Sequence, residues 1–141
     1  MGVRVRVLLK VGDKVVETSA LANAGFESDE LDVVLPFKLA RRLGLLEGKL
    51  RAEYVEVDTA GGPQACVYLR GVLELKLVLT DRETKAITCN VLINPRETEV
   101  LLSDAVLEEL GIEILSPRSG VWRLRDDEPS LKRRSAKPEY W

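Results

Sequence analysis

Short stretches of alternating apolar and polar residues, each ended by turn residues, constrain this 141-residue chain more than any other feature. The clearest are VRVRVLL at residues 3–9 and VLELKLVLT at residues 72–80. Alternation with a period of two is typical of strands that bury one face. Helical patterns are confined to PFKLARRLGL, which begins at Pro36, and AVLEEL, for which Ser103 supplies an N-cap. The sequence therefore predicts a mostly β fold.

Other segments share the strand pattern and are separated by Gly, Pro, Asp or Ser. They are residues 15–22, 52–58, 65–69, 86–93, 100–102, 112–115 and 121–125. We expect about eight or nine strands and two short helices, arranged as a closed or partly open β-barrel with a single lobe.

The domain is expected to span residues 1–125. Residues 126–141, DDEPSLKRRSAKPEYW, are charged and lack periodicity. Such a composition predicts a mobile C-terminal tail.

The charge balance and the absence of histidine exclude several functions. The chain has 21 basic and 23 acidic residues and a net charge of −2, whereas a nucleic-acid surface normally carries a basic excess. Without histidine there is no Ser-His-Asp or Cys-His catalysis and no His-ligated metal. Cys66 and Cys89 do not form a CxxC pair and are expected to be buried and structural. We expect no metal, no cofactor and no nucleic-acid partner.

The location and source are also predicted from composition. No apolar run approaches the ~20 residues of a membrane span, and the first residues alternate too much for a signal peptide. We expect a cytoplasmic protein with reduced thiols and no membrane partner. One Gln, one Met and three Asn beside many charged residues are typical of a thermophile protein. In a thermophile, a disulfide between Cys66 and Cys89 remains an alternative to two reduced thiols.

The order of the elements carries a resemblance. A strand ends in the small turn Asn23-Ala24-Gly25, and an apolar VVLP leads into a helix. A hairpin with the tip Thr59-Ala60-Gly61-Gly62 follows, and later Leu101-Leu102-Ser103 runs into a second helix. Over residues 3 to 125 this order resembles the retropepsin-like aspartic protease family. The resemblance implies an acid-protease-like barrel, a flap at residues 59–62, and support of the site by residues 101–103.

The departures from the family pattern matter for function. Asn23 stands where the resemblance places the catalytic Asp, Ala24 where it places Thr or Ser, and Ser103 where it places Gly. In such enzymes two carboxylates share a proton and activate a water molecule. A carboxamide cannot act as a general base, and general acid–base help is typically worth about 10²–10⁴ in rate. The sequence therefore predicts a pseudoenzyme.

Other carboxylates are candidate substitutes. Asp29 and Asp32 belong to an acidic run after the turn, together with Glu27 and Glu30. This run could also bind a cation or a basic partner peptide, but a solvated loop is the favoured interpretation. Asp58 precedes Thr59-Ala60-Gly61, a string closer to Asp-Thr-Gly, but strands follow it rather than a helix. The alternative interpretation of Asp58 is a strand end at a hairpin tip.

Three functions remain open from the sequence. The first is a non-catalytic protein that binds a peptide or another ligand in a groove under the flap. The second is an active aspartic endopeptidase, with an Asp restored at position 23 or a substitute carboxylate. The third is a structural or assembly protein. Since the resemblance implies a site divided between two copies and the chain has one motif, we expect a homodimer.

Overall fold

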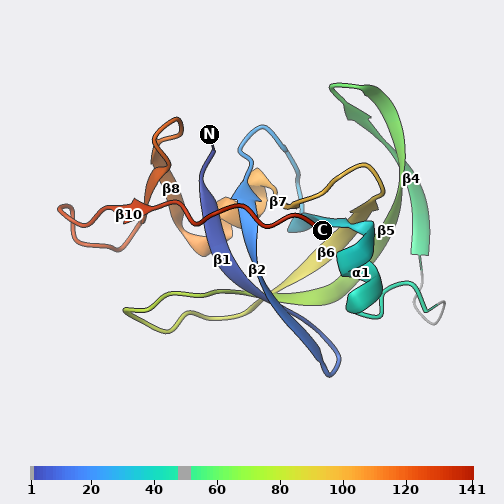
Figure 1. Ribbon diagram of the computed structural model, residues 1–141, viewed down its shortest axis with the longest axis horizontal. Coiled ribbons are helices and arrows are strands. Elements are labelled where there is room, and N and C mark those ends of the chain that lie inside the picture. The colour runs from blue at the N-terminus through green and yellow to red at the C-terminus, as the bar shows by residue number, and fades with distance from the viewer. Residues whose placement is uncertain (1, 48–51) are drawn as a thin grey trace.

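The computed structural model describes residues 2–47 and 52–141, and in these ranges it contains ten strands and two helices (Figure 1). The strands are β1 (Arg4–Val11), β2 (Lys14–Ala22), β3 (Asp32–Pro36), β4 (Ala52–Thr59), β5 (Gly62–Leu77), β6 (Ile87–Asn94), β7 (Val100–Leu102), β8 (Ile112–Ser116), β9 (Val121–Leu124) and β10 (Arg133–Arg134). The helices are α1 (Phe37–Arg42) and α2 (Asp104–Leu110).

Six strands close into a barrel in the order β1-β2-β7-β3-β6-β5. Closure comes from antiparallel pairing of β1 with β5, from Val7 opposite Leu77 to Lys10 opposite Glu74. β4 pairs only with β5 and so extends beyond the barrel as a hairpin. The prediction of a mostly β, single-domain barrel with two short helices is confirmed.

The alternation in the sequence sets which side chains fill the barrel. In β1, Val5, Val7 and Leu9 are buried, while the residues between them are only partly covered. In the second half of β5, Leu73, Leu75 and Leu77 are buried in the same way. Each strand thus contributes one apolar face, and these faces form the main core.

β5 is longer than the sequence predicts, because it joins the segments expected at 65–69 and 72–80 into one strand. The register against β6 shifts between Leu69 and Leu73, and Gly71 in this interval has φ of 62°. This left-handed conformation strains residues with a Cβ, so glycine suits the bend. The bend lets one strand pair with β4 before Gly71 and with β1 after it.

β3 is buried along its whole length, from Asp32 to Pro36. It pairs in parallel with β6 and antiparallel with β7, so it lies inside the sheet. Pro36 is the N-cap of α1, which agrees with the predicted start of that helix. Ser103 caps α2, since its Oγ accepts a hydrogen bond from the backbone N–H of Val106.

The segment 126–141, predicted as a separate charged tail, makes specific contacts with the rest of the chain. β10 pairs with β9, completing a small sheet with β8. The remaining residues cross β1 and β2 (Figure 1), where Ala136 N–H donates to the carbonyl of Arg4 and the Trp141 indole donates to Thr18 Oγ1. The mobility of this segment stays a prediction.

Among the described residues, no helix is long and apolar enough to cross a membrane.

Arg133 fixes this segment to the body of the protein, and its removal is a test of that attachment. Its guanidinium donates four hydrogen bonds of 2.8–3.0 Å, two to Asp81 and two to Asp127, whose side chain is 3% exposed. We expect Arg133→Met to lower the free energy of unfolding at pH 7 by about 2 kcal/mol, because Asp127 loses its ion pair and keeps only the hydrogen bond from the Leu124 N–H. Urea unfolding measures this.

The loss should depend on pH. Hydrogen bonds from Arg133 lower the pKa of both Asp81 and Asp127. Their stabilisation is therefore present above the ordinary aspartate pKa of about 3.9 and is lost as pH falls through the lower folded values. The difference in free energy of unfolding between wild type and Arg133→Met should therefore become smaller as the pH falls from about 4 to about 2. The control is Arg134→Met, which changes the exposed neighbouring residue. An equal loss of unfolding free energy in this control, or a difference between wild type and Arg133→Met that stays constant down to about pH 2, would contradict the prediction.

Candidate functional site

The turn after β2 is held by β7. The three residues of β7 pair in parallel with β2 and antiparallel with β3, so β7 separates two strands that are consecutive in the chain. The backbone N–H of Asn23 continues this pairing by donating to the carbonyl of Leu102 at 3.2 Å. Phe26 N–H then donates to the carbonyl of Asn23 at 2.9 Å, which closes the turn. Asn23 is half-buried, and Ala24 and Gly25 are exposed.

The predicted flap is the β4–β5 hairpin. Thr59 pairs with Gly62 across the two-residue turn Ala60-Gly61. Gly62 has φ of 104°, a conformation that favours glycine in a tight hairpin. Figure 1 shows the hairpin rising from the barrel, with its tip curving back over the molecule.

A groove with a cavity volume of about 820 Å³ lies between the flap and the turn. The turn contributes Asn23 and Gly25, and the flap contributes Asp58 and Ala60. The remaining lining residues are Phe26, Glu27, Val34, Val57, Cys66, Leu92, Asn94, Glu97 and Leu101. Most of the apolar ones belong to a second hydrophobic cluster, separate from the barrel core. The groove therefore has an apolar floor with polar groups at its rim.

The loop between β6 and β7 supplies a carboxyl group to this groove. Glu97 is half-buried, and burial together with the nearby Glu99 raises its pKa. Burial and the charge of Glu97 raise the pKa of the Cys66 thiol. Cys66 therefore stays a neutral thiol in the groove rather than a nucleophilic thiolate. Cys89 is a second free thiol, and burial in the barrel core raises its pKa to about 12.

The three predicted support residues divide between groove and core. Leu101 lines the groove, whereas Leu102 and Ser103 are fully buried beneath it. The backbone N–H of Ser103 donates to the carbonyl of Asp32 at 3.3 Å, so this position links β7 to the start of β3. The following residue, Asp104, accepts a hydrogen bond from the Ser28 N–H at 2.9 Å. The support residues thus hold both ends of the loop that follows Asn23.

The candidate substitute carboxylates lie in different places. Asp58 lies in the flap at a strand end, as its alternative interpretation predicts, and it lines the groove. Asp29 lies with Ala24 in another cavity of about 650 Å³, bordered by α2 and β8. Asp32 is 9% exposed and does not belong to the residues given above as the lining of the groove.

Asp32 instead anchors the base of the flap to the barrel. Its carboxylate accepts hydrogen bonds from the Tyr68 hydroxyl at 2.6 Å, from the Asn90 amide at 3.0 Å, and from the Ser28 hydroxyl. Tyr68 lies on β5 within the cluster under the groove. Burial and the hydrogen bond to Asp32 raise the pKa of Tyr68, so its hydroxyl remains a donor. Asp32 is therefore engaged in structure rather than free to accept a proton from a water molecule.

Sequence reasoning missed Glu97, Asn94 and Phe26 as groove residues. No spacing rule connects Glu97 with Asn23, because Glu97 precedes β7, Asn23 follows β2, and only the folded chain places both in one groove. The turn Asn94 to Glu97 offers one signal, since Asn after a strand often accepts backbone hydrogen bonds. Asn94 does so here, its side chain accepting from Arg96 N–H at 3.0 Å and its carbonyl from Glu97 N–H at 3.2 Å.

The sequence matches no protein-family model, and no curated protein shows significant similarity to it.

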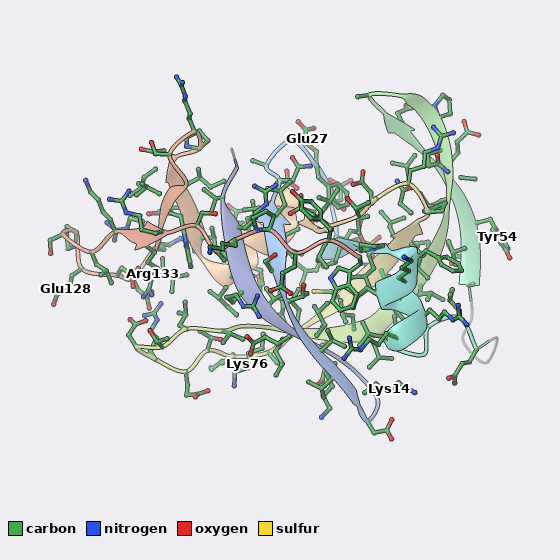
Figure 2. The ribbon with its side chains drawn as sticks, in the orientation of Figure 1. Lys14, Glu27, Tyr54, Lys76, Glu128 and Arg133 are labelled. Atoms are coloured by element: carbon green, nitrogen blue, oxygen red, sulfur yellow. The ribbon has the colours of Figure 1, made fainter. Side chains whose placement is uncertain are left out.

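Tyr68→Phe tests the anchor between Asp32 and the flap. Loss of the hydroxyl leaves a buried carboxylate with one donor fewer, and we expect the free energy of unfolding to fall by about 1–3 kcal/mol. The control is Tyr54→Phe on the adjacent strand β4, where the side chain is 85% exposed and points away from the molecule (Figure 2). Urea unfolding should separate the two variants; equal stabilities would mean that the hydrogen bond to Asp32 contributes nothing.

Proposed function

We propose that this chain is a retropepsin-like protein that binds an extended peptide in the groove between flap and turn, with little or no peptidase activity. The observation that carries this proposal is the common groove lined by Asn23, Gly25 and the flap tip residue Ala60. The order of turn, helix, hairpin, short strand and second helix supports the same assignment.

The chemistry of Asn23 argues against hydrolysis. Its carboxamide cannot take a proton from water near neutral pH. Two polar groups of the loop after the turn, the Ser28 hydroxyl and the Asp32 carboxylate, are bonded to each other. The carboxylates that line the groove, Glu27, Asp58 and Glu97, come from the loop after the turn, the flap and the β6–β7 loop, and none of them occupies position 23.

Peptide binding needs none of these catalytic groups. A volume of about 820 Å³ accommodates several side chains, and the floor formed by Val34, Leu92 and Leu101 is apolar. Apolar side chains of a peptide would be desolvated there, and each well-buried one contributes about 1.5–3 kcal/mol before the cost of ordering the peptide. The hairpin adds extended backbone, which pairs readily with another extended chain.

Filling the groove should abolish this binding. Ala60 is exposed at the flap tip, so Ala60→Trp places an indole at the groove without disturbing the core. With a displayed library of random octapeptides, wild type should enrich binders and Ala60→Trp should lose them, with affinities reduced at least about tenfold.

The matched control is Asp13→Trp, which adds the same side chain to the β1–β2 turn. Its neighbour Lys14 lies at the opposite side of the molecule from Glu27 (Figure 2). If wild type and Ala60→Trp enrich the same peptides, the peptides do not bind in the groove. If wild type enriches no peptide, the structural or assembly role is favoured.

A second candidate function, an aspartic endopeptidase, is favoured by Asp58, a candidate substitute carboxylate that lines the groove together with Asn23. This function requires an Asp restored at position 23 or a substitute carboxylate. Because the chain has one turn of this kind, it also requires a homodimer with the two turns facing each other. The exposure of Ala24 and Gly25 supports such a pairing.

Asn23→Asp tests the endopeptidase and the dimer together. We expect wild type to be inert on a fluorogenic peptide and Asn23→Asp to cleave it in the acidic range, where one of two paired carboxyls keeps its proton. Specific activity should rise with protein concentration over the range in which sedimentation equilibrium detects dimer formation. A folded, dimeric and inert Asn23→Asp protein would instead assign the loss to Ala24, Ser103 or the groove shape.

We place this function in the cytoplasm of a thermophile. Two free thiols suit a reducing compartment, and the three-membered ion-pair group Arg133, Asp81 and Asp127 suits high temperature.

A further inference from the structure

The charged groups that line the groove are all acidic. Among the described residues they are Glu27 from the loop after β2, Asp58 from the flap, and Glu97 from the β6–β7 loop. No Lys or Arg of the described chain lines this groove. Three separate segments thus contribute acidic side chains to one groove with an apolar floor.

These three carboxylates are also without ion pairs to other described residues, although ion pairs are frequent elsewhere. The contrast is clear in the β6–β7 loop. Glu99 forms two hydrogen bonds with Arg4, at 2.7 and 2.9 Å, whereas Glu97, two residues earlier, faces the groove. The loop therefore neutralises one carboxylate internally and leaves the other for an external partner.

The backbone at Glu97 is held by hydrogen bonds within its own loop. The carbonyl and side chain of Asn94 accept hydrogen bonds from Glu97 N–H and Arg96 N–H, and Asn94 itself is 5% exposed. Because this backbone is already ordered, less conformational entropy of the loop is lost when Glu97 binds a cation.

We propose that the groove selects a cationic peptide, an extended segment that places a Lys or Arg side chain among Glu27, Asp58 and Glu97 with apolar residues on either side. This inference rests on the proposed function and names its ligand. The aliphatic stem of Lys or Arg packs on an apolar floor while its charged end reaches the carboxylates. A hydrogen bond between ionised partners is roughly twice as strong as a neutral one.

The same arrangement rejects other ligands. A neutral apolar peptide would cover the three carboxylates without supplying a partner, and desolvating an unpaired charge is costly. An acidic peptide would add like-charge repulsion. Selectivity thus comes as much from rejection as from attraction.

Binding should be coupled to pH through Glu97. The groups around it are Glu99 on its own loop, which is paired with Arg4, the neutral thiol of Cys66 on β5, and the carboxylates of Asp58 and Glu27 across the groove. Burial and Glu99 raise the pKa of Glu97 in the free protein, and a bound cation would lower it. Affinity should therefore be full above the free-state pKa and fall as pH decreases through it.

Three fluorescein-labelled octapeptides test this, identical except for one central residue between Val and Leu neighbours. That residue is Arg, its neutral isostere citrulline, or Glu. By fluorescence anisotropy at pH 7 we expect the Arg peptide to bind about tenfold more tightly than the citrulline peptide, and the Glu peptide to bind most weakly. The Arg preference should shrink between pH 7 and pH 4.

Two variants and one control locate the effect. Glu97→Gln and Asp58→Asn should each reduce the preference for Arg over citrulline about threefold or more while leaving citrulline binding unchanged. Glu128→Gln is the matched control, because Glu128 lies at the end of the molecule opposite Tyr54 on β4 (Figure 2). Circular dichroism confirms that each variant is folded.

The outcomes separate this inference from the proposed function. Equal binding of the Arg and citrulline peptides, both lost in Ala60→Trp, would overturn the cationic preference and keep the groove. An Arg preference unchanged in both Glu97→Gln and Asp58→Asn would move the cation elsewhere and overturn the inference. Binding of none of the peptides, or binding unaffected by Ala60→Trp, would overturn the proposed function as well.

Discussion

The insertion of β7 between β2 and β3 is the constraint on which the site depends. A three-residue strand buries little surface of its own, and it is stable because its backbone groups pair with β2 on one side and β3 on the other. The chain that leaves β2 must therefore arch over the end of β7 before it enters β3. That arch begins with the turn at Asn23, whose N–H bonds to the carbonyl of Leu102 at the end of β7. The loop before β7 enters at the opposite end of that strand, and Asn23, Leu101 and Glu97 line one groove.

The flap is connected to the barrel through one bent strand, β5. Up to the bend at Gly71, β5 belongs to the hairpin with β4, and beyond it β5 closes the barrel with β1. The hydroxyl of Tyr68, close to the bend, reaches Asp32 at the start of β3. The hairpin is thus attached to the barrel both through its backbone and through one buried carboxylate.

Much of this fold follows from local patterns, and the site does not. Alternation along β1 and in the second half of β5 identifies strands and their buried faces, while Pro36 and Ser103 mark helix starts. The sequence did not predict β3, because a strand that is buried on both faces shows no alternation of apolar and polar residues. Asn23 and Asp58 could be singled out from strings of small residues. Glu97 could not, since its place depends on strand order, which no local pattern encodes.

The closing pair β1–β5 has a kinetic consequence. Val7 lies opposite Leu77, and every residue between them in sequence belongs to the intervening chain that must first be looped. The entropy of closing that loop is lost before the contact is gained, and folds dominated by such distant pairings fold in roughly milliseconds to seconds. During this time the open edge of β1, with its apolar Val5, Val7 and Leu9, is exposed to other chains. Pairing with β5 covers this edge in the folded barrel. Because that pairing forms slowly, refolding at high protein concentration is the step most prone to aggregation.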